Sequence, residues 1–363
     1  MELQHFLRNT GTPERLTALY GIMVKPHGKY PNLILCKYSQ IDSPMGERIV
    51  QESRGCILDS ANNWEVVARP YDKFFNYEEG HAAQIDWNTA KVFEKCDGSL
   101  CTLYHYNDEW LVATSGSPDA SGNVNDFGFS FNDLFWQVWQ EKQYQLPTDT
   151  SKCYMFELMT PYNRIVVQHS KNNLLLHGVR DRNGVEYCPE EAAKSHGWHC
   201  VPSFALNTLD GVVEASKALK GIECEGYVVT DSFFKRIKIK CPQYIAIHHL
   251  KSSFSQRRMT EIILCGESTE ILSYFEEFRP LHDEILSKYN LLLSEIETVY
   301  SNIKDIENQK EFASYATKYK FQGILFTMRK CNIDCKKCLI NMNIKNVMEL
   351  LEIKEGVLVI EDV

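Results

Sequence analysis

Between about residues 20 and 250 the chain alternates short apolar runs with turn residues. Runs such as NLILCKYS, LCTLYHY, NRIVVQ (163–168) and RIKIK have the pattern of strands, and Asn-Asp, Asp-Gly or Asn-Gly pairs separate several of them. Two stretches, 129–142 and 208–220, have the periodicity of helices instead. The pattern therefore predicts a strand-dominated α+β domain built on antiparallel sheet.

The pattern changes after about residue 255, where apolar residues recur at three- and four-residue steps and glycine is almost absent. This change predicts helices throughout the C-terminal third. A chain of 363 residues also suits two domains better than one. We expect an antiparallel-sheet domain over 1–250, followed by a smaller all-α domain over 251–363.

Composition narrows the class of protein. The net charge of −9 argues against a protein that coats nucleic acid, because such proteins bind phosphates through many cations. This charge does not exclude a local basic site: if a polyanion binds, we expect it where FFKRIKIK (233–240) and KSSFSQRR (251–258) concentrate cations. The N-terminus does not resemble a signal peptide, and no apolar run has membrane-spanning length. This predicts a cytoplasmic protein without membrane partners, or one in the host cytoplasm if it is viral.

The 13 cysteines are expected to be thiols, since their number is odd and most lie in strand-like runs. Cys331, Cys335 and Cys338 have a C-x3-C-x2-C spacing that is also found in metal-binding proteins. No obvious fourth ligand is adjacent. We interpret these three residues as surface thiols.

The stretch KVFEKCDGSL (91–100) places Lys95 two residues before an Asp-Gly turn. A lysine amine attacks phosphorus only when it is deprotonated, so a catalytic Lys95 needs cations, a metal or desolvation around it. Asp97 and Gly98 would supply a tight turn that lets a nucleotide approach the backbone. The alternative is a solvated lysine at the tip of a hairpin.

Three further charged positions follow in the same domain. Glu157 lies inside an apolar strand and Glu225 lies directly before one, so each is either a solvated carboxylate or part of a site for ribose or Mg²⁺. In RIKIK, strand alternation places Lys238 and Lys240 on one face. An exposed edge strand has the same pattern. A nucleophile, two acids and a lysine pair together form a set suited to phosphoryl transfer.

In this order the four elements resemble the covalent nucleotidyltransferase superfamily of ATP-dependent ligases and capping enzymes. Further blocks resemble the RNA ligase 1 family, typified by the tRNA-repairing ligase of T-even phages, across about residues 50–250. The blocks are ESRGCILD, ARPYDKFFN, EKCDGSL, FELMTPYNRIVV, LLLHGVRDRNGVEY, EGYVV and KIKCPQYIAIH.

The resemblance implies an ATP-dependent RNA ligase. Lys95 would attack the α-phosphate of ATP, release pyrophosphate and carry AMP as a lysyl phosphoramidate. The AMP would pass to the 5'-phosphate of an RNA end, and a 3'-hydroxyl would then displace it to seal the strand. The implied partners are RNA ends, as single strands or broken stem-loops such as tRNA, and a separate end-healing kinase or phosphatase.

The resemblance also assigns the remaining site residues. Arg54 and Lys73 would engage the triphosphate, Glu157 the ribose, and Glu225 a metal ion. Mg²⁺, or alternatively Mn²⁺, is the implied ion, with Glu157 as a second acid near it. The nucleotide site would also include Asp97, Gly98 and the pair Lys238 and Lys240, which would contact the α-phosphate.

Two positions depart from the family pattern. Residues 113–117 read ATSGS where the phage relative has the basic KSKGS, and LLLHGV leaves His177 or an aliphatic residue to contact the base. The alternatives are a GTP-dependent capping guanylyltransferase, a DNA ligase, or a non-catalytic RNA-binding protein. A helical C-terminal region argues against the first two, because such enzymes usually append an OB-fold.

Overall fold

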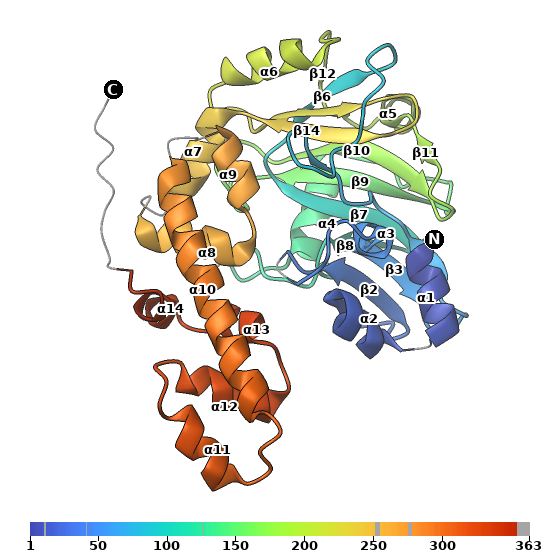
Figure 1. The fold of residues 1–363 in the computed structure, drawn as a ribbon. Helices are drawn as coiled ribbons and strands as arrows, with labels where there is room; N and C mark the ends of the chain where they lie inside the picture. Colours follow the sequence, from blue (N-terminus) through green and yellow to red (C-terminus); the bar gives the residue numbers. More distant parts are fainter. Residues whose placement is uncertain (11, 41, 126, 251–254, 275–277, 354–363) are drawn as a thin grey trace. The chain divides into compact units, whose positions relative to one another are not determined.

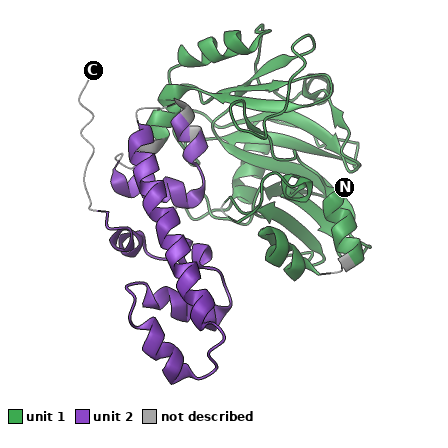
Figure 2. Cartoon of the chain, in the orientation of Figure 1, with its two compact units in different colours: residues 1–248 green, residues 249–363 purple. Residues whose placement is uncertain are grey.

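The computed structural model describes residues 1–10, 12–40, 42–125, 127–250, 255–274 and 278–353. The chain divides into two compact units, residues 1–248 and 249–363 (Figure 2). Unit 1 contains three β-sheets with helices around them, and the described part of unit 2 is helical (Figure 1). The mixed α+β class with largely antiparallel sheet is confirmed.

The first sheet is entirely antiparallel and has the strand order β1-β2-β3-β4. Helices pack on one of its faces through a core that includes Leu3, Leu16 and Val50. The strands are β1 (Ile22–Pro26), β2 (Leu33–Tyr38), β3 (Arg54–Asp59) and β4 (Glu65–Ala68), and the helices are α1 (Glu2–Thr10), α2 (Pro13–Tyr20) and α3 (Arg48–Glu52).

The second sheet is also antiparallel, with the order β11-β10-β9-β7-β8. Its alternating side chains reach two cores: Tyr104 packs with residues of the first sheet, while Leu103 packs with α4. The elements are β7 (Ser99–Tyr106), β8 (Glu109–Thr114), β9 (Lys152–Met159), β10 (Asn173–Asp181), β11 (Glu186–Tyr187), α4 (Phe131–Glu141) and α5 (Pro189–His196).

The third sheet has the order β12-β6-β13-β14-β5, in which only the short β5–β14 pair is parallel. Val92, Val229 and Ile239 form its core with α6, and Phe93 packs with Met159 and Leu175 of the second sheet. The elements are β5 (Phe75–Asn76), β6 (Lys91–Lys95), β12 (Ser203–Phe204), β13 (Gly226–Thr230), β14 (Arg236–Lys240), α6 (Leu209–Lys217) and α7 (Pro242–Leu250).

Unit 2 has its own hydrophobic core, centred on residues such as Ile296, Phe312 and Leu325. Cys335 and Cys338 belong to this core at 1% and 6% exposure, so their interpretation as surface thiols is wrong; Cys331 is exposed. The helices are α8 (Gln256–Cys265), α9 (Ser268–Tyr274), α10 (Arg279–Ile303), α11 (Gln309–Ala316), α12 (Gln322–Cys331), α13 (Cys335–Ile340) and α14 (Ile344–Leu350).

Most expected elements of unit 1 are present, including the helices near 129–142 and 208–220. The strand expected over NRIVVQ (163–168) is absent, because the backbone there bonds to side chains instead: Val166 and Val167 donate their N–H groups to a carboxylate. Among the described residues, no helix is both long enough and apolar enough to cross a membrane.

Candidate active site

Lys95 is the last residue of β6, and the chain crosses from the third sheet into the second directly after it. The interpretation of Lys95 to Gly98 as a hairpin tip is therefore wrong, since β6 and β7 belong to different sheets. The Lys95 side chain is 23% exposed and lines a cavity between these sheets. A lysine in this position is neither fully solvated nor buried.

Asp97 holds the crossing in place. The residue is 3% exposed, and both oxygens of its carboxylate accept hydrogen bonds. One oxygen accepts hydrogen bonds from the N–H groups of Val166 (2.9 Å) and Val167 (2.6 Å), and the other accepts from the hydroxyl of Tyr244 (2.7 Å). A Cβ on Gly98 would lie 2.5 Å from the carbonyl oxygen of Leu158, which explains the need for glycine. Asp97 and Gly98 thus fix the backbone behind Lys95.

Glu225 makes direct contact with Lys95. Because β6 pairs with β13 and brings Gly226 opposite Lys95, the Lys95 Nζ lies 2.6 Å from Oε2 of Glu225. The other oxygen, Oε1, is 3.5 Å from Nζ of Lys240. The Glu225 side chain is 8% exposed. Its carboxylate is shared by Lys95 and Lys240, and all three residues line the cavity.

The lysine pair of β14 has the expected orientation. Ile237 and Ile239 are buried at 4% and 0% exposure, while Lys238 and Lys240 line the cavity from the opposite face. β14 lies between β13 and β5, so it is not an edge strand. The lysines therefore do not protect a sheet edge.

Glu157 projects from β9, an inner strand of the second sheet. Its Oε2 lies 3.5 Å from Nε2 of His177. This Nε2 atom is buried and has no hydrogen-bond partner among the described residues. The His177 ring stacks on Tyr71 at a centroid distance of 5.5 Å, and the Tyr71 hydroxyl donates to the His177 carbonyl oxygen (2.6 Å). Arg236 covers the Tyr71 ring at 4.1 Å from its centroid.

Arg54 and Lys73 are both held against aromatic rings. The Arg54 guanidinium lies 5.2 Å from the centroid of Phe74, and its Nη1 is buried without a hydrogen-bond partner in the described part of the chain. Lys73 Nζ lies 4.8 Å from the ring of Tyr38 and 5.0 Å from that of Phe75. A buried guanidinium nitrogen without an acceptor is the expected state of an anion site before its ligand arrives.

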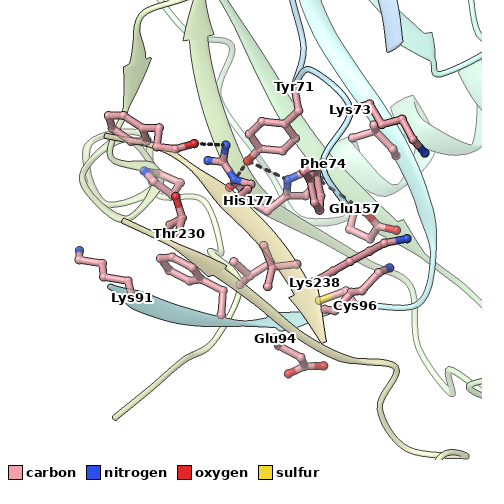
Figure 3. Close-up of a pocket in the computed structure, with 18 of the residues that line it drawn as sticks. Tyr71, Lys73, Phe74, Lys91, Glu94, Cys96, Glu157, His177, Thr230 and Lys238 are labelled. Carbon is pink, nitrogen blue, oxygen red and sulfur yellow. Dashed lines mark hydrogen bonds and ion pairs between the residues drawn. The ribbon is translucent and has the colours of Figure 1, made fainter. Parts of the chain in front are cut away.

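These side chains line one cavity of about 460 Å³, which we call the nucleotide cavity. Figure 3 shows Lys91 at one end and Glu157 and Lys238 at the other. Seven cationic and four acidic side chains line it. Of the nine residues expected from the sequence, seven are among them: Arg54, Lys73, Lys95, Glu157, Glu225, Lys238 and Lys240. Asp97 and Gly98 lie behind the wall.

The cavity also includes residues that the sequence analysis did not assign. Tyr71 and Phe74 belong to the block ARPYDKFFN, and Glu94 directly precedes Lys95, so their position in matched blocks was an available signal. Burial raises the pKa of the Glu94 carboxyl. Lys91, Thr230 and Asp231 lie outside any pattern that could have indicated them.

A comparison with family models identifies a family for this chain. The model described as RNA ligase matches residues 52–244, which is more than half of the chain and includes the described lining of the nucleotide cavity except Tyr38 and Gln40. The chain belongs to the RNA ligase family. The expected family is thereby confirmed, and the capping, DNA ligase and non-catalytic alternatives are not favoured.

Curated relatives agree with this assignment. An RNA ligase of Rhodothermus phage RM378 is 26% identical over 80% of this chain and 81% of its own length. A protein of Autographa californica nuclear polyhedrosis virus, provisionally named a bifunctional polynucleotide kinase/RNA ligase, is 24% identical over 98% of this chain. The present chain spans about half of that protein, 54% of its length.

Solved structures with a related shape include ligases from two sources. An archaeal ATP-dependent RNA ligase aligns with a TM-score of 0.46 and 14% identity, over 73% of this chain and 68% of its own. A Naegleria gruberi RNA ligase with pyrophosphate aligns with a TM-score of 0.34 over 44% of this chain and 51% of its own.

Proposed function

We propose that this protein is an ATP-dependent RNA ligase that joins 5'-phosphate and 3'-hydroxyl ends through a lysyl-AMP intermediate. Residues 1–250 would form the adenylyltransferase domain, and residues 251–363 would form a smaller helical domain that helps to bind the RNA. The observation that carries the proposal is the contact between Lys95 and Glu225 inside a largely cationic cavity of nucleotide size. Family membership supports the same reaction.

In the first step Nζ of Lys95 would attack the α-phosphorus of ATP. A P–N bond forms, the bond to the bridging oxygen breaks, and pyrophosphate leaves with that electron pair. Lys95 would attack as the free amine, so its ammonium proton must first pass to a base such as solvent water. Lys238 and Lys240 would offset the charge on the transferring phosphoryl group.

Arg54 and Lys73 would hold the β- and γ-phosphates. Both line the nucleotide cavity, and the buried Nη1 of Arg54 supplies a donor without an acceptor. A guanidinium matches phosphate oxygens in a bidentate manner, and the flanking rings restrict both side chains beforehand. Glu157, near His177, would meet the ribose or the metal.

A divalent ion, Mg²⁺ or Mn²⁺, fits these residues. No group of three or more histidine, cysteine or acidic side chains suited to a metal occurs in the described ranges. Mg²⁺ usually binds proteins through one or two carboxylates together with substrate phosphates, so Glu225 and Glu157 suffice with ATP present. Such an ion supplies charge neutralisation at the phosphates.

The next two steps would use RNA ends as substrates. The 5'-phosphate of a donor strand takes the AMP from Lys95, and an acceptor 3'-hydroxyl then expels AMP as the phosphodiester forms. A kinase and a phosphatase acting on RNA ends would prepare these termini. The name of the viral relative joins a kinase with a ligase, which supports that pairing. We place the reaction in the cytoplasm, or in the host cytoplasm for a viral protein.

Covalent labelling tests the proposal. The protein, first freed of bound AMP with pyrophosphate, is mixed with α-labelled ATP and a divalent ion, denatured and examined for protein-bound label. We expect a label that Lys95→Ala abolishes and that Lys217→Ala, an exposed lysine outside the cavity, retains. A label that survives Lys95→Ala would remove the nucleophile assignment, and the absence of label with ATP and GTP would overturn the proposed reaction.

A further inference from the structure

A second cavity, of about 450 Å³, adjoins the nucleotide cavity. The two share Lys73, Phe74, Phe234 and Arg236 in their walls. Lys95 and Glu225 line the nucleotide cavity but are not among the described residues that line the second cavity. The second cavity thus extends away from them. It is therefore a continuation of the site on the side where Lys73 would hold the triphosphate.

This second cavity is cationic, although the chain as a whole carries a net charge of −9. Five cationic side chains face two carboxylates in its wall. Asp72 is shared by Arg48 (2.6 Å) and Arg180 (2.9 Å), and Glu186 binds Arg236 (2.6 Å). These contacts neutralise part of the charge, and Lys73 and Lys235 leave the wall with a positive excess that suits phosphates.

The rim of the cavity exposes an aromatic side chain. Phe233 is 73% exposed and stands in the turn between β13 and β14, beside Lys235. A ring this exposed beside a lysine can stack on a base while the lysine meets the adjoining phosphate. Val185, 53% exposed, lies in the wall of the same cavity.

The turn that carries Phe233 is fixed by Asp231. The Asp231 carboxylate is 4% exposed and accepts from the N–H groups of Phe233 (2.9 Å) and Lys235 (3.0 Å) through Oδ1. Its Oδ2 accepts from the N–H of Asp86 (3.2 Å), which ties the turn to a neighbouring segment. The exposed ring and the lysine are thus presented on an ordered turn, as a preformed binding surface requires.

We propose that the second cavity and its Phe233 rim bind the 5'-terminal nucleotides of the donor RNA strand. A base would stack on Phe233, and the adjoining phosphates would meet Lys235 and Lys73. Single-strand binders combine these same elements, an aromatic platform and a positively charged groove. The inference rests on the proposed function, because it places the strand where its 5'-phosphate can reach AMP on Lys95.

The position of Lys73 explains why the donor strand takes this route. Pyrophosphate leaves from the α-phosphorus opposite Lys95, and the RNA 5'-phosphate must later attack from the same side, since displacement at phosphorus is in line. Both groups therefore occupy the Lys73 side in turn. Pyrophosphate carries no base, so the exposed ring of Phe233 is explained by RNA and not by the leaving group.

Direct binding tests the inference. Fluorescence anisotropy is measured with the full chain and a 5'-phosphorylated, 3'-labelled single-stranded RNA of about ten nucleotides, within the site sizes of single-strand binders. We expect Phe233→Ala to weaken binding about 5- to 150-fold and Phe233→Trp to retain it. Lys235→Ala should make the negative slope of log affinity against log salt less steep, by about 0.7.

Matched controls separate this inference from the proposed function. Ile222→Ala removes another exposed apolar side chain, 59% exposed, and Lys217→Ala another exposed lysine, both outside the two cavities. Labelling of Lys95 is recorded in parallel and reports on the nucleotide cavity alone. RNA affinities of Phe233→Ala and Ile222→Ala that agree within about twofold would overturn the RNA site, whatever the labelling result.

Discussion

Glu225 contacts both Lys95 and Lys240, so the proposed attack by Lys95 would begin from a closed ion pair. Lys95 Nζ lies 2.6 Å from one carboxylate oxygen of Glu225, and Lys240 Nζ lies 3.5 Å from the other. In the proposed reaction Glu225 would help to hold a divalent ion and Lys240 would contact the α-phosphate of ATP. The proposed reaction therefore requires Lys95 to separate from Glu225 when ATP binds.

Arg54 gives a prediction that distinguishes the steps of the reaction. Arg54→Ala should slow self-adenylation about 10- to 100-fold, the effect of losing a charge-assisted hydrogen bond. It should impair sealing of a pre-adenylated donor less, because the triphosphate exists only in the first step. Gel assays of both reactions give the comparison.

Lys73 lines both cavities, whereas Arg54 is among the described residues of the nucleotide cavity, so the two variants can be compared. Lys73→Ala should also impair self-adenylation more than sealing, but with a smaller gap than Arg54→Ala. Equal losses in both reactions for Arg54→Ala would contradict the triphosphate role.

At the scale of elements, the junction between β6 and β7 is the feature on which the site depends. The third sheet positions Lys95 and Glu225, the second sheet positions Glu157 and His177, and the chain passes from one to the other within residues 95–99. Asp97 accepts three hydrogen bonds at this crossing, one of them from Tyr244 in α7. Helix α7, which follows Lys238 and Lys240, is thereby tied to the segment directly after Lys95.

Glycine substitutions test how closely this junction is packed. Gly98→Ala should destabilise the protein by about 1–3 kcal/mol, because the new Cβ meets the backbone oxygen of Leu158 at 2.5 Å. In Gly80→Ala nothing lies within 4 Å of the new Cβ, so that variant should be neutral or slightly more stable. Urea unfolding measures both, and equal stabilities would contradict the close packing.

At the scale of the whole molecule, the two units have separate hydrophobic cores. The core of unit 2 is formed entirely by residues between 259 and 353, and the cores of the three sheets by residues of unit 1. Both described cavities are lined by unit 1 alone. We therefore expect the proposed transfer of AMP to Lys95 to depend on side chains of unit 1.

A fragment of residues 1–250, which keeps α7 whole, should fold and accept AMP from ATP. We expect its labelling rate to be within about tenfold of the full chain, since every described side chain of the nucleotide cavity is retained. Labelling with α-labelled ATP, together with circular dichroism of the fragment, gives the measurement. A folded fragment without label would show that the helical unit takes part in the first step.

The sequence predicted the structure best where an alternating apolar pattern and the charged side chains within it indicate the same strand. Strand periodicity predicted β14 and the shared face of Lys238 and Lys240, because alternation is a property of the extended backbone. It failed at 163–168, where apolar residues read as a strand but bond to the buried carboxylate of Asp97. A contact across about 70 residues leaves no periodic trace in the sequence.

The sequence by itself determined the family blocks, the α+β class and the residue types that phosphoryl transfer requires. Tertiary structure alone decided which of them meet: strand pairing brings Gly226 opposite Lys95 and so Glu225 onto its amine. It also placed Asp97 behind the cavity wall and opened the second cavity beside Lys73. Composition and periodicity act along the chain, whereas the contacts that make a site depend on sheet register and on packing between sheets.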